Sequence, residues 1–195
     1  VITSGNHIWD QREIVPYLDS GLPVIRPLNY PPGTPGRGYI RTGDFLIVNL
    51  LGRVFIGTCD CPFRTMDHLL SELGDGPRLI LVDLHAEATS EKQAMGWYLD
   101  GRVSVVAGTH THVPTADLRI LPGGTAYVSD LGMVGSTDSV IGSQVEDVLH
   151  RFLTQTPRRL RVATEGPVRF NSVLFDIDET TGKATAITRI DRELP

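Results

Sequence analysis

The amino-acid sequence predicts a mixed α/β fold in which parallel strands come first and antiparallel strands come last. Continuous apolar runs at Phe45–Leu50, Leu79–Leu84 and Val103–Ala107 are typical of buried strands. An amphipathic helix over Thr89–Leu99 joins the second run to the third. A strand, a helix and a strand within about 30 residues form a βαβ unit, so we expect these two strands to be parallel.

Shorter elements are expected before and between these strands. The apolar opening Val1–Thr3 is interpreted as the end of a strand that begins earlier. Asp10–Leu18 is expected to be a helix whose first turn is capped by Asp10 through a capping box. Pro23–Gly38 is a long loop without periodicity, and loops of this kind are often functional or lid-like. Met66–Leu73 is expected to be a second helix.

Alternating patterns dominate the last third of the chain. Leu118–Leu121 and Thr125–Ser129 flank a Pro-Gly-Gly turn, which predicts a hairpin. A helix is expected over Val145–Phe152. Three further segments are expected to be antiparallel strands: Arg161–Ala163, Val168–Ile177 and Lys183–Ile190. The sequence contains no internal repeat, and we expect one domain over residues 1–195.

Composition limits the class of protein. The 195 residues are 41% hydrophobic, which is enough to build a core and argues against bulk disorder. The net charge of −5 argues against a partner such as duplex nucleic acid, although a local cationic site could still bind a small anion. Because no apolar run reaches the roughly 18–20 residues of a membrane span, a cytoplasmic protein without a membrane partner is expected. Cys59 and Cys61 are expected to be free thiols.

Four histidines follow the carboxyl ends of predicted strands: His7, His85, His110 and His112. Ligands bind at that edge of an open α/β sheet, so we expect these side chains to gather there. Imidazole is a common ligand for Zn, Fe and Mn ions, and His110 and His112 can face one ion or two adjacent ions. Asn6 adds a hard amide oxygen, whereas His7 beside it could act as a general acid instead of a ligand.

Each of these residues also has a purely structural interpretation. The pair His110 and His112 could be loop residues that bind nothing. Asn6 could stabilise a turn through its own side chain, and His85 could be a packed or surface histidine. The convergence of several such residues on one sheet edge favours the metal site.

Weaker candidates surround this group. Arg26 and Arg53 lie in loops near the edge and could contact phosphate or be surface arginines. Glu87 could cap the helix that follows it. Asp117 and Asp130 could accept hydrogen bonds from ligand histidines or belong to surface turns. No Gly-rich phosphate loop, dinucleotide fingerprint or G-x-S-x-G elbow occurs in the sequence.

At these residues the sequence resembles the calcineurin-like metallophosphoesterases, and most closely the YmdB-like branch of bacterial cyclic-nucleotide phosphodiesterases. Four strings carry the narrower resemblance: Gly5–Asp10 (Gly-Asn-His-Ile-Trp-Asp), Arg26–Tyr30 (Arg-Pro-Leu-Asn-Tyr), Asp83–Lys92 (Asp-Leu-His-Ala-Glu-Ala-Thr-Ser-Glu-Lys) and Gly108–Asp117 (Gly-Thr-His-Thr-His-Val-Pro-Thr-Ala-Asp). The resemblance extends along essentially the whole chain.

The resemblance implies a fold, a reaction and a set of residue roles. The fold would be a two-sheet β-sandwich flanked by helices. The reaction would be hydrolysis of cyclic nucleotides of the 2′,3′-cyclic AMP type with two metal ions, iron or manganese. Carried over by position, Asn6, His85 and His110 would bind one ion and His112 the other, while His7 would stabilise the transition state or protonate the leaving oxygen. The partner is then a small phosphodiester whose contact residues are unassigned, and a homo-oligomer is compatible with this assignment.

The chain departs from the family pattern at its start. That pattern begins with an Asp block and a Glu-Asn block, which supply further metal ligands, and neither occurs before Gly5. Asp44 is a poor replacement because it precedes its strand. We therefore expect a metallophosphoesterase domain that is incomplete at its N-terminus and lacks its amino-terminal third.

Two other classes of protein remain as alternatives to the phosphodiesterase. One is a truncated or degenerate non-catalytic module that binds metal or nucleotide. The other is an amidohydrolase-type metal hydrolase, which also uses a His-x-His pair. That class needs a barrel of eight βα repeats, and the sequence provides only about two such units.

Overall fold

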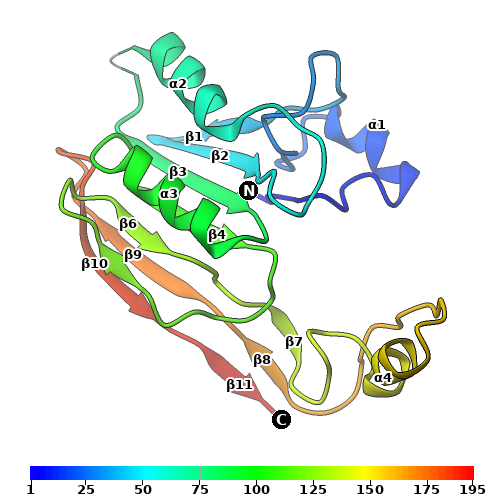
Figure 1. Cartoon of the computed structure of the whole chain (residues 1–195). Coiled ribbons are helices and arrows are strands. Elements are labelled where there is room, and N and C mark those ends of the chain that lie inside the picture. The colour runs from blue at the N-terminus through cyan, green and yellow to red at the C-terminus, as the bar shows by residue number, and fades with distance from the viewer. Residues whose placement is uncertain (75) are drawn as a thin grey trace.

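The computed structural model describes residues 1–74 and 76–195 and has the expected mixed α/β architecture (Figure 1). Its largest sheet has the strand order β1-β2-β3-β4-β6-β5. Along the chain these strands are β1 (Tyr39–Thr42), β2 (Phe45–Leu51), β3 (Leu79–His85), β4 (Val105–Thr109), β5 (Arg119–Ile120) and β6 (Ala126–Val128). β2, β3, β4 and β6 are parallel, while β1 and β5 are antiparallel edge strands. The parallel β3–β4 pair and the β5–β6 hairpin are confirmed.

Two helices cover one face of this sheet: α2 (Pro62–Leu73) and α3 (Thr89–Leu99). Met66 and Leu69 of α2 and Met95 and Leu99 of α3 are buried in one cluster with strand residues such as Val82. The helix predicted over 89–99 has the expected bounds, and the helix predicted over 66–73 begins one turn earlier. Burial of these apolar side chains is what fixes the helices on the sheet.

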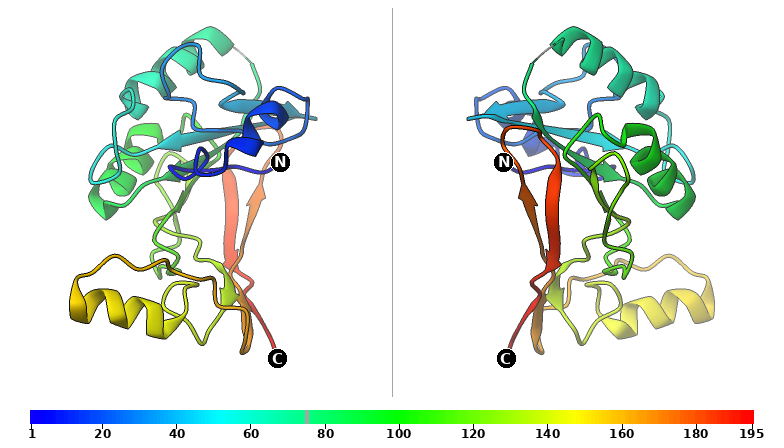
Figure 2. Two further views of the ribbon diagram at one scale, coloured as in Figure 1. Left: turned by 90° about the vertical axis from the view of Figure 1, so that its right-hand side faces the viewer. Right: turned by 90° about the vertical axis from the view of Figure 1, so that its left-hand side faces the viewer.

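A β-hairpin covers the opposite face of the six-stranded sheet. Its strands are β9 (Val173–Ile177) and β10 (Ala184–Arg189). Val105 and Val128 of the large sheet pack with Phe175 and Ile187 of the hairpin in a second apolar cluster. Both views in Figure 2 show α2 and α3 on one side and the hairpin on the other. The expected sandwich of sheets flanked by helices is confirmed.

A smaller sheet continues from the hairpin towards the C-terminus. It has the order β11-β8-β7, and its strands are β7 (Val134–Ser136), β8 (Val168–Phe170) and β11 (Arg192–Leu194). The helix α4 (Val145–Thr154) lies beside this end of the molecule (Figure 1), in agreement with the helix predicted there.

The single strand predicted over 168–177 is wrong, because the chain changes sheets in its middle. β8 pairs with β7 and β11, whereas β9 pairs with β10. At the break, the Asn171 N–H donates to the Met133 carbonyl and the Ser172 N–H donates to the Asp191 carboxylate, at 3.2 and 2.8 Å. These two amides therefore serve different neighbours, and the ladder cannot continue.

The helix predicted over 10–18 is also wrong in its first half. The structure has a short 3-10 helix over Arg12–Ile14 and α1 (Val15–Leu18). Pro16 lies in the first turn of α1, where a missing N–H is tolerated. The side chain of Asp10 does not cap a helix and contacts His7 instead.

Two predicted strands are reduced to single bridges. Ile2 forms one parallel bridge with Val24, and Val162 forms one antiparallel bridge with Ser143. Among the described helices, none is long and apolar enough to cross a membrane. Cys59 and Cys61 are free thiols, both partly buried.

The loop over residues 23–38 is folded around the side chain of Arg26. This guanidinium is nearly buried, at 9% exposed, and donates to five backbone carbonyls. The acceptors lie in the same loop: Pro27, Leu28, Thr34, Pro35 and Gly36. Neither role considered for Arg26 is correct, because its hydrogen bonds hold the loop and leave little for phosphate or solvent.

Candidate functional site

The predicted residues lie at one edge of the large sheet, where its parallel strands end. His85 is the last residue of β3 and pairs in register with Thr109, the last residue of β4. His110 follows directly. The N-terminal segment reaches the same edge because the Ser4 N–H donates to the side chain of Asn49 on β2, at 3.2 Å. Asn6 therefore lies beside the ends of β3 and β4.

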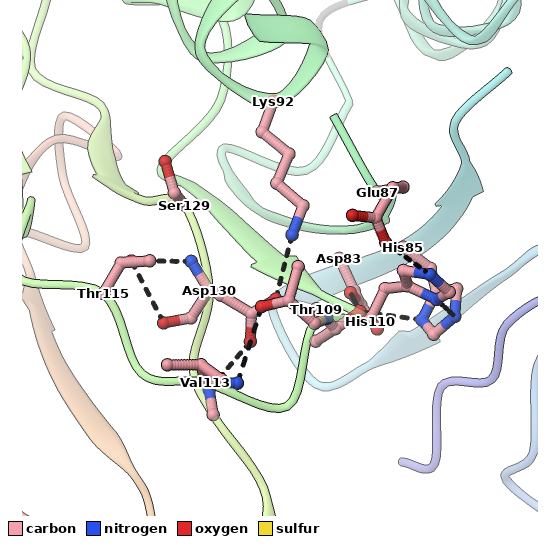
Figure 3. Close-up of polar contacts among 12 residues, drawn as sticks. Asp83, His85, Glu87, Lys92, Thr109, His110, Val113, Thr115, Ser129 and Asp130 are labelled. Carbon is pink, nitrogen blue, oxygen red and sulfur yellow. Dashed lines mark hydrogen bonds and ion pairs between the residues drawn. The ribbon is translucent and has the colours of Figure 1, made fainter. Parts of the chain in front are cut away.

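Asn6, His85 and His110 meet in space, as the resemblance implies. The Asn6 Oδ1 atom lies 2.9 Å from His85 Nε2, and His85 Nε2 lies 3.0 Å from His110 Nδ1. The two imidazole rings are nearly perpendicular, with an interplanar angle of 79° and centroids 4.8 Å apart. Figure 3 shows both histidines in this arrangement. Polar atoms from two other parts of the sequence thus lie within hydrogen-bond distance of His85 Nε2.

A hydrogen-bonded relay determines which nitrogen of His85 carries the proton. The Thr109 hydroxyl lies 2.7 Å from Asp83 Oδ1 and 3.0 Å from His85 Nδ1. Burial raises the pKa of Asp83 to about 6, so this carboxylate is largely ionised at neutral pH and accepts the hydroxyl proton. The Thr109 oxygen then accepts from the Nδ1–H of His85. The Nε2 atom of His85 is left with a lone pair.

Both histidines are neutral at neutral pH. Burial, with a contribution from His110, lowers the pKa of His85 to about 4. Burial also lowers the pKa of His110, against the opposing charge of Glu87. The carboxylate of Glu87 lies 3.0 Å from His110 Nε2, so that nitrogen carries the proton. The Nδ1 atom of His110 therefore carries a lone pair, which is directed at His85.

The convergent atoms fit a metal ion. Asn6 Oδ1, His85 Nε2 and His110 Nδ1 are three acceptors that face one another with no hydrogen between them, an arrangement that a cation stabilises. Atoms that bind one ion at about 2.1 Å, with bonds at right angles, lie about 3 Å apart. Imidazole nitrogens suit transition-metal ions such as zinc and iron, and an amide oxygen suits harder ions. Over residues 1–74 and 76–195, however, no group of three or more His, Cys, Asp or Glu side chains is arranged to hold a metal.

His112 follows on the same turn and makes a contact of its own. Its Nδ1 atom donates to the carbonyl of Ile141 at 2.7 Å, which leaves Nε2 as its available nitrogen. His110 and His112 both have left-handed backbone conformations, with φ of 105° and 67°. Side chains rarely tolerate this region, and strained residues of this kind cluster at functional sites.

His7 forms an exposed pair with Asp10. Its Nδ1 atom lies 2.9 Å from Asp10 Oδ2, and the two side chains are 74% and 63% exposed. The carboxylate accepts from Nδ1–H and turns Nε2 outward. His7 follows Asn6 directly, so an accessible imidazole stands beside the three convergent atoms.

Two glycines permit this close packing. A Cβ atom at Gly5 would lie 2.3 Å from His85 Nε2, and one at Gly108 would lie 1.8 Å from the Ser129 carbonyl oxygen. Both positions therefore exclude larger residues. The glycines in the strings around Asn6 and His110 are required by contacts made far away in the sequence.

The sequence interpretation missed the supporting residues of the site. Asp117 and Asp130 could accept from histidines or belong to surface turns; in the structure Asp117 accepts from Ser129 and Asp130 accepts from Thr111. The residues that do contact the histidines are Asp83, Glu87 and Thr109. One signal was available for Asp83: it precedes His85 by two residues on one strand, so both side chains point to the same face. Glu87 was assigned to a helix cap and instead binds His110.

The comparisons with known sequences agree with one another. A family model described as YmdB-like protein matches residues 1–190. A 2′,3′-cyclic-nucleotide 2′-phosphodiesterase of Bacillus subtilis is 48% identical over 193 residues, which are 97% of this chain and 73% of that protein. A putative phosphatase/phosphodiesterase of Mycoplasma pneumoniae is 37% identical over 195 residues, which are 93% of this chain and 68% of that protein.

Two solved structures have the same fold. A hypothetical protein from Thermus thermophilus is 46% identical and superposes with a TM-score of 0.92, over 100% of this chain and 77% of the other. A structure described as a novel phosphatase from Mycoplasma pneumoniae is 34% identical, with a TM-score of 0.89 over 99% of this chain and 72% of the other.

Proposed function

Because the chain belongs to the family of YmdB-like proteins, we propose that it is a phosphoesterase that hydrolyses 2′,3′-cyclic nucleotides. The observation that carries the proposal is the convergence of Asn6 Oδ1, His85 Nε2 and His110 Nδ1 at one sheet edge. The substrate class comes from the relative that is 48% identical and is a 2′,3′-cyclic-nucleotide 2′-phosphodiesterase. The bond that breaks is then the one between phosphorus and the ribose 2′ oxygen.

Asn6, His85 and His110 would hold one metal ion, with iron and manganese as the candidates. Such an ion supplies positive charge opposite the phosphoryl oxygens and makes water acidic enough to attack at neutral pH. Residues of this chain fix the protonated nitrogen of each histidine, so that the other nitrogen can bind the ion. Asp83 and Thr109 keep the proton of His85 on Nδ1, and Glu87 keeps the proton of His110 on Nε2.

His112 would belong to a second ion. Its free nitrogen is Nε2, because Nδ1 is used by the Ile141 carbonyl. In the part of the chain that the structure describes, His112 belongs to no group of three His, Cys, Asp or Glu side chains that could hold a metal ion. The other ligands of that ion would come from the Asp and Glu-Asn blocks of the family pattern.

His7 would donate the proton that the reaction needs. Water adds to phosphorus and releases one proton to solvent, the bond to the 2′ oxygen breaks, and that oxygen takes a proton from His7 Nε2, leaving a nucleoside 3′-phosphate. The Asp10 carboxylate holds the other nitrogen, so the donor points outward to the substrate. The high exposure of His7 allows it to exchange its proton with solvent between turnovers.

The proposal is tested with 2′,3′-cyclic AMP as substrate. The purified full-length protein is incubated with MnCl2, and the products are separated by chromatography that distinguishes the 2′ and 3′ phosphates. We expect 3′-AMP, with the reaction stopped by EDTA and restored by excess Mn²⁺. Binding of Mn²⁺ without any turnover, at protein concentrations near that of the substrate, would contradict the enzyme and favour a non-catalytic metal or nucleotide-binding module.

A further inference from the structure

A buried ion pair lies beneath the turn that carries His110 and His112 and has no role in the reaction described above. Lys92 Nζ lies 2.9 Å from Asp130 Oδ2, and the two side chains are only 2% and 1% exposed. Lys92 belongs to the first turns of α3, and Asp130 follows the end of β6. The pair therefore joins the helix layer to the functional edge of the sheet, as Figure 3 shows.

Asp130 uses its carboxylate to hold the residue between the two histidines. Its Oδ2 atom accepts from the backbone N–H of Thr111 at 2.9 Å and from the Thr111 hydroxyl at 2.8 Å. Its Oδ1 atom accepts from the Gly132 N–H at 2.9 Å. The Lys92 stem passes beneath the end of β4, since a Cβ atom at Gly108 would lie 3.0 Å from Lys92 Cδ. The pair thus contacts the turn after β4 through Thr111 and the segment after β6 through Gly132.

The turn needs such support because its backbone is strained. His110 and His112 both have positive φ, and Thr111 is the residue that connects them. Residues in this region stay there only when the surrounding structure holds them. Thr111 is bound to Asp130 through both its backbone and its side chain, and this fixes the position from which the two imidazoles project.

A role in stability alone explains the pair poorly. Two charges lose their hydration when they are buried, and a buried ion pair is often no more stable than apolar side chains of similar volume. A carboxylate that served only to neutralise Lys92 would not need two hydrogen bonds from Thr111. The pattern of contacts indicates that its function lies in the geometry of the histidine turn.

We propose that Lys92 and Asp130 are positioning residues, which act through Thr111 to aim His110 and His112 at the reacting phosphate and its metal ions. The inference rests on the proposed function. The structure supports it with four hydrogen bonds to one carboxylate, two of them from Thr111.

The experiment compares Thr111→Val with Thr111→Ser, because these changes lie on a partly exposed turn and spare the buried charges. The valine removes the hydroxyl that donates to Asp130, and the serine keeps it. Mn²⁺ affinity is measured by calorimetry, and kcat and KM are measured with 2′,3′-cyclic AMP. Loss of a residue that orients ligands costs about 10- to 100-fold in metal affinity. We expect about a tenfold loss of Mn²⁺ affinity and of kcat for the valine, little change in KM, and recovery with the serine.

Asp130→Asn and Lys92→Met test the pair itself. We expect each folded variant to lose about 10- to 100-fold in Mn²⁺ affinity. If either fails to fold, the Thr111 variants decide the question alone. Equal Mn²⁺ affinity and kcat in wild type and Thr111→Val, with only a lower melting temperature, would overturn the inference.

Hydrogen exchange at the Thr111 amide separates this inference from the proposed function, because it is measured without metal or substrate. We expect slow exchange in the wild type and fast exchange in Asp130→Asn or, failing that, in Thr111→Val. Fast exchange in the wild type would overturn the positioning role even if the protein hydrolyses cyclic nucleotides. If the Thr111 amide exchanges slowly in the wild type and fast in the variant, the positioning role is supported even if no cyclic nucleotide is hydrolysed.

Discussion

The site has two halves that are held in different ways. The sheet-held half is His85 and His110, which stand at the ends of parallel strands and are supported by Asp83, Thr109 and Glu87. The turn-held half is the segment Gly5–Asp10, which carries Asn6 and His7. In the first half every imidazole has a fixed partner within a partly buried network. In the second half His7 is 74% exposed and has one partner, which is itself exposed.

The difference matches two chemical tasks. A metal ligand needs a lone pair at a fixed place, and strands with buried hydrogen bonds supply that rigidity. A proton donor needs access to substrate and solvent, which a surface turn supplies. Asn6 connects the two halves, since it lies on the turn but points at His85. Changes in the sheet-held half should therefore cost stability and metal affinity, and changes at His7 should cost turnover alone.

The largest effect is expected from Gly108→Ala. The new methyl group would lie 1.8 Å from the Ser129 carbonyl oxygen, so the ends of β4 and β6 would have to separate. We expect the free energy of unfolding to fall by about 3 kcal/mol or more, as measured by urea denaturation. Gly57→Ala is the matched control, because a Cβ atom there meets nothing within 4 Å. Similar stability for the two variants would show that the sheet-held half is less rigid than described.

His7→Ala should produce the largest loss of activity at unchanged stability. Removing a general acid typically lowers turnover by about 10²- to 10⁴-fold. We expect a loss in this range with 2′,3′-cyclic AMP, while Mn²⁺ affinity and the melting temperature stay the same. His68→Ala is the control, because His68 is equally exposed and contacts only Glu72. Normal turnover in His7→Ala would refute the assigned role, and a large loss of Mn²⁺ affinity would remove the distinction between the halves.

Gly5→Ala tests the contact between the halves. Its methyl group would lie 2.3 Å from His85 Nε2 and 2.4 Å from both Cδ2 and Cε1, against the face of the imidazole ring, so the ring would have to move. Because the turn is at the surface and can shift, we expect the melting temperature to fall less than in Gly108→Ala. We expect Mn²⁺ affinity, measured by calorimetry, to fall by about 10- to 100-fold. Unchanged affinity would mean that the metal lies elsewhere.

Asp10→Asn should have the smallest effect. An exposed ion pair is worth up to about 1 kcal/mol, which corresponds to about a fivefold change in rate. We expect kcat to fall by about that factor, with KM and stability unchanged. A loss as large as that of His7→Ala would indicate that Asp10 has a direct part in the reaction.

Much of the fold could be predicted because local patterns and packing agree. The apolar strands before His85 and His110 and the helix over 89–99 each have the period of the element they form. The parallel arrangement follows from the short crossover, and it brings both histidines to one edge. The strand predicted over 168–177 failed because an alternating pattern does not tell to which sheet each half belongs.

The supporting residues could not be predicted for a related reason. The spacing around Asp10 predicts a helix cap, but its carboxylate binds the His7 side chain instead. Arg26 has the charge to bind phosphate, but five carbonyls of its own loop surround it. Glu87 contacts His110 and Asp130 contacts Thr111, and both contacts depend on the conformation of the turn after β4. The sequence near Glu87 or Asp130 does not indicate that conformation.

The central claim is that Asn6, His85 and His110 hold one cation between them. Crystals of the protein soaked in MnCl2 and measured near the manganese absorption edge test it directly. The account predicts an anomalous peak at about 2.0–2.3 Å from Asn6 Oδ1, His85 Nε2 and His110 Nδ1. Manganese bound only at other positions, with these three side chains unchanged and no peak among them, would contradict it.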